Sequence, residues 1–191
     1  MDLPIRKPNR LPNYDYSQIG TYFVTVCVQD MRCILSSVIG DANIIVGEAD
    51  PGLPQADHGL PSTNAETNSE IPHVRLTAYG RMVADNLEQM NRIYTNIHVD
   101  HSVIMPNHVH LLISIKRDHS CGRPGSASPT TDLTRFVAAF KKYTNKACGF
   151  SVWQRSFHDR VIRDDNDYRL HWRYIDENPK KWLMGKDAYY S

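Results

Sequence analysis

The chain has 191 residues, with 22 lysines and arginines against 21 aspartates and glutamates, for a formal net charge of +1. That length suits one domain with a sizeable core. No apolar run reaches the roughly 18 residues of a membrane span, no signal peptide is indicated, and the four cysteines form no CxxC pair. We therefore expect a cytoplasmic protein with free thiols that makes no use of a membrane.

The near-zero charge is an average over unlike parts of the chain. Residues 36–75 carry six acids and only Arg75 as a base. Removing their −5 from the total of +1 leaves +6 on the rest, enough for a surface that contacts phosphate. The same stretch is rich in proline and polar residues between about 40 and 72, which predicts a flexible acidic insertion. A second loop is predicted at about 117–131.

The remaining pattern predicts strands and helices in a mixed order. Alternating or β-branched segments predict strands at 20–28, 33–38, 97–105 and 108–115, and a final extended segment at 152–162. Apolar residues at helical spacing predict helices at 76–94 and 132–147, followed by a third helix that Pro179 ends. This order predicts an α+β domain whose helices pack on one face of an antiparallel sheet.

The most informative segment sets two histidines into an apolar strand. His108 and His110 are two residues apart, so their side chains share one face, while Val109 and Leu111 point into the core. Two neutral imidazoles placed this way form half of a divalent-metal site. A pair of solvent-facing histidines on a half-buried strand would look the same in the sequence.

The third helix offers further ligands. Tyr174 and Asn178 are four residues apart and therefore lie on one helical face. A phenol and a carboxamide could supply a nucleophile and a neutral oxygen ligand to one metal ion. The alternative is that Tyr174 packs in the core and Asn178 caps the helix.

Three segments, in this order, resemble the REP-associated tyrosine transposases, the single-tyrosine branch of the HUH endonucleases. They are Met105–Leu112, Val152–Asp164 and Tyr174–Trp182, and Gly20–Cys27 also looks like the first strand of that family. The resemblance covers most of the chain outside the two loop-like stretches. It implies one HUH-type transposase domain over residues 1–191 with a ferredoxin-like core.

The resemblance also implies an activity: metal-dependent cleavage and rejoining of single-stranded, hairpin-containing DNA through a covalent 5′-phosphotyrosine. His108, His110 and Asn178 would hold Mg²⁺ or Mn²⁺, and Tyr174 would be the nucleophile. REP-like hairpin DNA would be the partner, and the protein would act as a monomer or homodimer. Side chains suited to stacking or phosphate contact are the candidate DNA-binding residues. They are Trp153, Arg155, Lys141, Lys142, Lys180 and Lys181.

Three alternatives remain open. Tyr143, in a basic stretch of the second helix, is a rival nucleophile, although Ala147 four residues on cannot coordinate a metal. The chain could keep the fold and bind DNA without transposition. It could also be a small metal-dependent hydrolase in which Asp100 joins the histidine pair.

Overall fold

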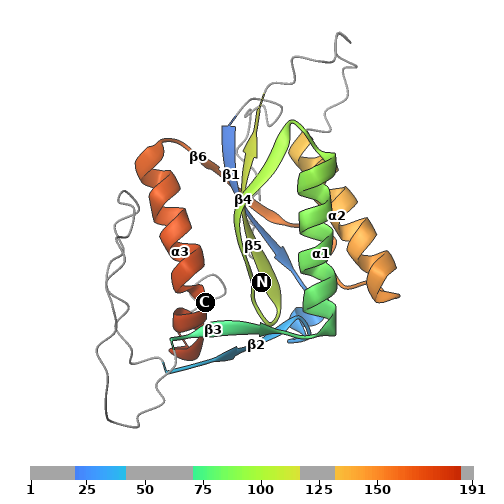
Figure 1. The fold of residues 1–191 in the computed structure, drawn as a ribbon, viewed down its shortest axis with the longest axis vertical. Helices are drawn as coiled ribbons and strands as arrows, with labels where there is room; N and C mark the ends of the chain where they lie inside the picture. Colours follow the sequence, from blue (N-terminus) through green and yellow to red (C-terminus); the bar gives the residue numbers. More distant parts are fainter. Residues whose placement is uncertain (1–19, 42–70, 117–131, 186–191) are drawn as a thin grey trace, which may run out of the picture.

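The computed structural model describes residues 20–41, 71–116 and 132–185. Within them, one sheet has the strand order β4-β5-β1-β6, all neighbours antiparallel, and a separate hairpin pairs β2 with β3 (Figure 1). The strands are β1 (Gly20–Cys27), β2 (Ser36–Ile39), β3 (His73–Leu76), β4 (Ile97–Ile104), β5 (His108–Ile115) and β6 (His158–Ile162). The helices are α1 (Ala78–Ile93), α2 (Asp132–Cys148) and α3 (Asp165–Leu183). None of the helices in these ranges combines the length and apolar character needed to cross a membrane.

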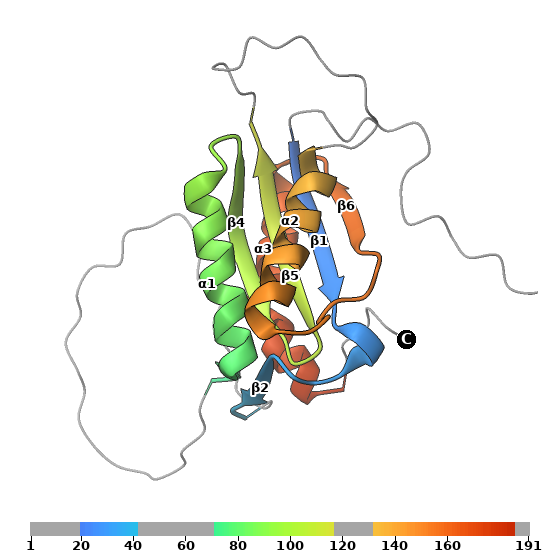
Figure 2. The ribbon, with the colours of Figure 1, turned by 90° about the vertical axis from the view of Figure 1, so that its right-hand side faces the viewer.

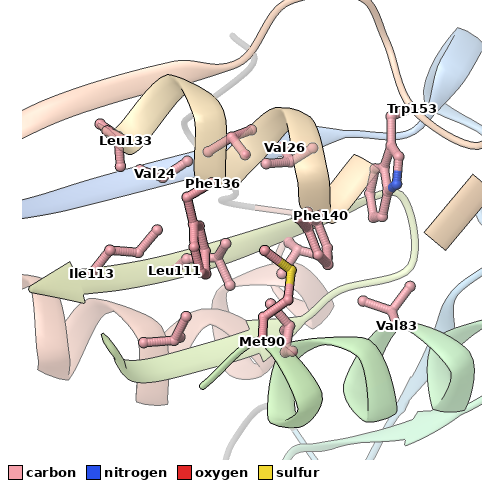
Figure 3. Packing of buried hydrophobic residues seen from close by; sticks show 14 of the residues in the cluster. Val24, Val26, Val83, Met90, Leu111, Ile113, Leu133, Phe136, Phe140 and Trp153 are labelled. Atoms are coloured by element: carbon pink, nitrogen blue, oxygen red, sulfur yellow. The ribbon is translucent and has the colours of Figure 1, made fainter. Parts of the chain in front are cut away.

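Leaving aside the β2-β3 hairpin and the final helix α3, the elements follow the β-α-β-β-α-β order of a ferredoxin-like fold. The predicted α+β class with an antiparallel sheet is confirmed. Helices α1 and α2 cover one face of the sheet, as Figure 2 shows from their side. Alternate residues of the two central strands, including Val24 and Val26 of β1 and Leu111 of β5, meet Phe136 and Phe140 of α2 in the main core (Figure 3).

Helix α3 corrects the prediction that the helices pack on one face. It lies on the opposite side of the sheet from α1 and α2 (Figure 1). There, Ile175 packs with Phe23 and Leu112 in a second, smaller core. Strands β1 and β5 carry large apolar residues on both faces of the sheet. Each face therefore needs helices to cover it, which is why α3 packs on the face opposite α1 and α2. The histidine face of β5 is therefore buried rather than open to solvent.

The β2-β3 hairpin is inserted between β1 and α1. Its register runs from Ser36 opposite Leu76 to Ile39 opposite His73. The predicted insertion thus connects two paired strands, and residues 42–70 lie outside the described residues, as do those of the predicted loop at 117–131. Strand β3 was not predicted, since four residues give too short a pattern to recognise, and α1 begins at Ala78 instead of Leu76.

A close approach fixes the start of α1. The Thr77 hydroxyl accepts a hydrogen bond from the Gly80 amide at 3.1 Å, which caps the helix. A Cβ atom at Gly80 would overlap the carbonyl oxygen of Leu35. Only glycine lets the helix lie this close to the chain that leads into β2.

The prediction that Pro179 ends the third helix is wrong. Asp164 caps the start of α3 by accepting a hydrogen bond from the Asp167 amide at 2.8 Å. The helix then continues through the buried Pro179 to Leu183. Proline removes one backbone donor, but burial of this segment outweighs the loss and carries Trp182 back onto the second core.

Candidate functional site

His108 and His110 lie side by side on β5, beneath α3, and neither is exposed to solvent. Their Nε2 atoms are 3.0 Å apart. Burial lowers the pKa of His108 to about 4. Burial, with smaller contributions from His108 and His171, lowers the pKa of His110 well below its usual value. Both imidazoles are therefore neutral at pH 7, the form that coordinates metals.

The other ring nitrogens are held by polar neighbours. Nδ1 of His108 lies 2.7 Å from Oδ1 of Asn107, and Nδ1 of His110 lies 2.8 Å from the hydroxyl oxygen of Thr25. An amide oxygen only accepts, so His108 carries its proton on Nδ1 and directs a lone pair from Nε2. The Thr25 hydroxyl can donate or accept, so His110 can donate to His108 or direct a second lone pair beside the first. No sequence pattern indicated Thr25, which faces His110 only through the β1-β5 register.

Tyr174 lies on the α3 side of the same histidine pair. Its ring is 5.3 Å from that of His110 and 5.8 Å from that of Phe23, measured between centroids. The ammonium of Lys181 lies 4.6 Å from the centre of the Tyr174 ring and 2.9 Å from a carboxylate oxygen of Glu177. A cation thus stands beside the aromatic ring of the predicted nucleophile.

Asn178 faces the sheet one helical turn after Tyr174. It is fully buried, and both polar atoms of its carboxamide lack a hydrogen-bond partner within the described residues. Trp182, one turn further, has its ring 6.2 Å from that of His108. Since the residues one turn before and one turn after Asn178 both contact the histidine pair, the carboxamide lies on the helical face that covers it.

These groups fit a divalent cation. Among the described residues, no three histidine, cysteine, aspartate or glutamate side chains cluster as metal ligands. Within the described ranges, a third protein donor would therefore be of another type, and the amide oxygen of Asn178, which has no partner there, is such a group. Two imidazole nitrogens and one amide oxygen leave coordination positions for water or phosphate.

His171 of α3 lies near this site as well. Its ring lies 4.8 Å from that of Phe23. Its Nδ1 atom is 2.8 Å from the backbone oxygen of Asp167 and 3.2 Å from the carboxylate of the same residue. Arg160 of β6 also contacts that carboxylate, at 3.5 Å. The only hint in the sequence was that His171 lies three residues before Tyr174.

The predicted DNA-binding residues fall into two groups. Arg155 and Lys142 are exposed, while Lys180 and Lys181 are half-buried in the last turn of α3. Trp153 is 5% exposed and packs against Phe140 at 5.3 Å, so this indole is a core residue and offers no stacking surface. The ammonium of Lys141 points to backbone oxygens, as described below.

Two of the alternatives lose their geometric basis. Tyr143 is exposed on α2, across the sheet from the histidine pair. Asp100 accepts hydrogen bonds from Ser114 and, at 3.4 Å, from Tyr168. Ser114 is four residues along β5 from His110, about 13 Å away. Asp100 therefore does not join the histidines.

Known proteins similar to the chain were found both by sequence and by fold. No protein-family model matches the chain. A protein of unassigned function from Haemophilus influenzae is 24% identical over 192 residues, which cover 93% of this chain and 89% of its own length. From the same organism, a protein described as a REP-associated tyrosine transposase is 34% identical over 82 residues, or 41% of this chain and 47% of its own length.

The fold comparison is the decisive one. The solved structure of a REP-associated tyrosine transposase bound to a REP hairpin matches 90% of this chain and 73% of its own, with a TM-score of 0.54 at 21% identity. The chain has the fold of the REP-associated tyrosine transposases. The resemblance found in the three sequence segments is confirmed, and each of them contributes residues close to the histidine pair or to the sheet edge beside it.

Proposed function

We propose that the chain is a transposase of the REP-associated tyrosine type, which cleaves and rejoins single-stranded DNA that contains hairpins. One observation carries the proposal. The buried Nε2 atoms of His108 and His110 lie 3.0 Å apart beside Tyr174. The same helix, α3, carries Asn178, whose buried amide has no hydrogen-bond partner among the described residues. This geometry supports a site in which two imidazole ligands and a third neutral donor would hold a metal ion next to a tyrosine nucleophile. The similarity to a transposase in complex with a REP hairpin supports hairpin DNA as the substrate.

Phosphodiester cleavage needs an attacking oxygen and a way to neutralise charge on the phosphate. The Tyr174 phenol gives up its proton to solvent and its oxygen attacks phosphorus; the bond from phosphorus to the 3′ oxygen breaks, and the 3′ oxygen takes up a proton from solvent. The products are a phosphotyrosine on the 5′ side and a free 3′ hydroxyl. Attack by that hydroxyl, or by another one, on the phosphotyrosine reverses the step and joins DNA.

The residues of this chain have separate roles in that reaction. His108, His110 and Asn178 would hold Mg²⁺ or Mn²⁺, which when bound polarises a non-bridging phosphate oxygen. Asn107 and Thr25 orient the two imidazoles through their Nδ1 atoms. The ammonium of Lys181 lies against the Tyr174 ring, where its positive charge would stabilise negative charge that develops on the phenol during the reaction. Phe23 packs against the rings of His110 and Tyr174 and keeps them in place.

The test uses the purified protein and single-stranded hairpin oligonucleotides taken from the genomic flanks of its gene. With Mn²⁺ or Mg²⁺, a denaturing gel should show a protein-DNA adduct and a shortened oligonucleotide with a free 3′ hydroxyl, and EDTA should abolish both. Hairpin binding without any adduct under all metal conditions would instead favour a DNA-binding protein of the same fold that does not cleave.

A further inference from the structure

The segment between Trp153 and His158 bulges away from β1. Val28 pairs with Trp153, and Thr25 pairs with His158. Between these two pairs, the β1 side has two residues, Val26 and Cys27. The facing segment has four residues, 154–157. The extra residues cannot all bond to β1, so some backbone oxygens of the bulge need another partner.

Lys141 of α2 is that partner. Its ammonium nitrogen lies 2.9 Å from the backbone oxygen of Gln154, 3.3 Å from that of Arg155 and 2.7 Å from that of Ser156. An ammonium has three protons, so these three contacts use its full donor capacity. The same nitrogen lies 5.7 Å from the centre of the Phe157 ring, and burial lowers the pKa of Lys141 to about 8. Lys141 is thus directed into the bulge and away from any phosphate in solvent.

The bulge presents two exposed side chains, Arg155 and Ser156. Within the described part of the chain, the Arg155 guanidinium takes part in no ion pair, so it is available to a ligand. The bulge is also near the proposed site, because Cys27 pairs with His108 on the other side of β1. Two strand spacings separate the bulge from β5, about 10 Å between backbones. This spacing is short enough for one DNA strand bound at the proposed site to extend to Arg155.

We propose that Lys141 is a positioning residue for DNA binding: it fastens the 154–157 bulge so that Arg155 is held toward the phosphate backbone. The inference rests on the proposed function, since it assumes that the chain binds single-stranded DNA. A loop that is ordered before binding loses less conformational entropy when the complex forms, and a guanidinium is well suited to bidentate contact with phosphate. Lys141 therefore acts through Arg155 and not as a phosphate contact of its own.

The first part of the test needs no DNA. Lys141→Met keeps an unbranched apolar stem and removes the charge, and Lys142→Met, at the exposed neighbouring position of α2, is the matched control. Trypsin cleavage after Arg155, followed by mass spectrometry under native conditions, should accelerate about tenfold or more in Lys141→Met and stay unchanged in Lys142→Met. An unchanged rate in Lys141→Met would show that the ammonium does not hold the bulge. Should Lys141→Met fail to fold, Lys141→Gln, which can still donate to one oxygen, replaces it in both parts.

The second part measures the affinity of a labelled single-stranded hairpin oligonucleotide for Lys141→Met, Arg155→Ala and the double variant. Each single change should weaken binding about tenfold, and the double variant should bind no more weakly than Arg155→Ala. Additive losses would mean that Lys141 contacts the DNA itself, and unchanged affinity in Lys141→Met would also overturn the proposal. If the unaltered protein binds no hairpin at all, the proposed function fails. If instead the unaltered protein and Lys141→Met bind the hairpin equally well, only the proposal for Lys141 fails.

Discussion

The Nε2 atoms of His108 and His110 lie 3.0 Å apart in a fully buried position. Each imidazole is oriented from behind, by Asn107 and by Thr25, so that these two atoms face each other. Without a cation, the pair can be satisfied when His110 donates to His108. In the other tautomer, His110 would carry its proton on Nδ1 and donate it to the rotated Thr25 hydroxyl, which would leave both Nε2 lone pairs available to a cation. The arrangement therefore suits both the metal-free and the metal-bound protein.

Asn178→Leu should raise stability and lower metal affinity at once. The buried amide has no hydrogen-bond partner within the described residues, so replacing it with an apolar group of similar size removes a desolvation cost of about 1–3 kcal/mol. Urea denaturation in EDTA should show the variant to be more stable than the original protein. Titration with Mn²⁺ should show binding weakened by about tenfold or more, the scale of a lost ligand interaction. A variant that is less stable in EDTA and binds Mn²⁺ normally would mean that Asn178 is a structural residue.

The metal-free protein should lose stability on acidification. The pKa of His108 is about 4 in the folded chain and 6.5 in the unfolded chain, so the unfolded state binds more protons between these values. Stability is retained above pH 6.5 and falls as the pH drops toward 4, by about 3 kcal/mol for His108 alone. Urea denaturation in EDTA at several pH values measures how steeply the free energy of unfolding falls with decreasing pH, and this slope is the quantity to compare between variants.

His108→Leu should reduce that slope, whereas His73→Asn, a change at an exposed histidine of β3, should leave it unchanged. Equal slopes in the original protein and in His108→Leu would contradict the buried, neutral state assigned to His108.

Gly80→Ala should destabilise the fold, although the same change in an exposed helix interior usually stabilises it. The new Cβ atom would overlap the Leu35 oxygen, and moving α1 away from that oxygen should cost about 1–3 kcal/mol. Denaturation midpoints would show whether Gly80→Ala lowers or raises stability. Gln89→Ala, at an exposed position of the same helix, is the control. A more stable Gly80→Ala protein would show that α1 can shift freely.

Residues 41–70 should be replaceable by a short Gly-Ser linker without loss of DNA cleavage. Ile39 pairs with His73, so the two ends that the linker must join are neighbours across the β2-β3 hairpin. The stretch is acidic and should be repelled by phosphate, and shortening it should stabilise the fold by about 1 kcal/mol. A second variant keeps residues 44–46, which could form an edge strand. If both variants lose soluble expression or cleavage, the stretch belongs to the working domain.

The sequence predicted the parts of the site that depend on local periodicity. The two-residue period of β5 placed His108 and His110 on one face, and the helical period of α3 placed Tyr174 and Asn178 together. The fold class followed from the order of the elements. The side of the sheet that α3 covers did not, because both faces of β1 and β5 are apolar enough to need a cover.

Contacts between distant segments could not be predicted. Lys141 meets the bulge at 154–156, and Thr25 meets His110 across 85 positions in the chain. Both depend on strand register and on the packing of α2, which no local pattern encodes. Pro179 was misread for a related reason, since tertiary burial of α3 overrides the local tendency of proline to end a helix.

The central claim is that Tyr174 is the nucleophile at the histidine pair. Its most direct test is to digest the covalent protein-DNA adduct and identify the modified tyrosine by mass spectrometry. Tyr174→Phe and Tyr143→Phe proteins are treated in parallel. Our account predicts a modified peptide containing Tyr174, no adduct in Tyr174→Phe despite nearly normal hairpin binding, and a normal adduct in Tyr143→Phe. An adduct that persists in Tyr174→Phe and disappears in Tyr143→Phe would contradict it.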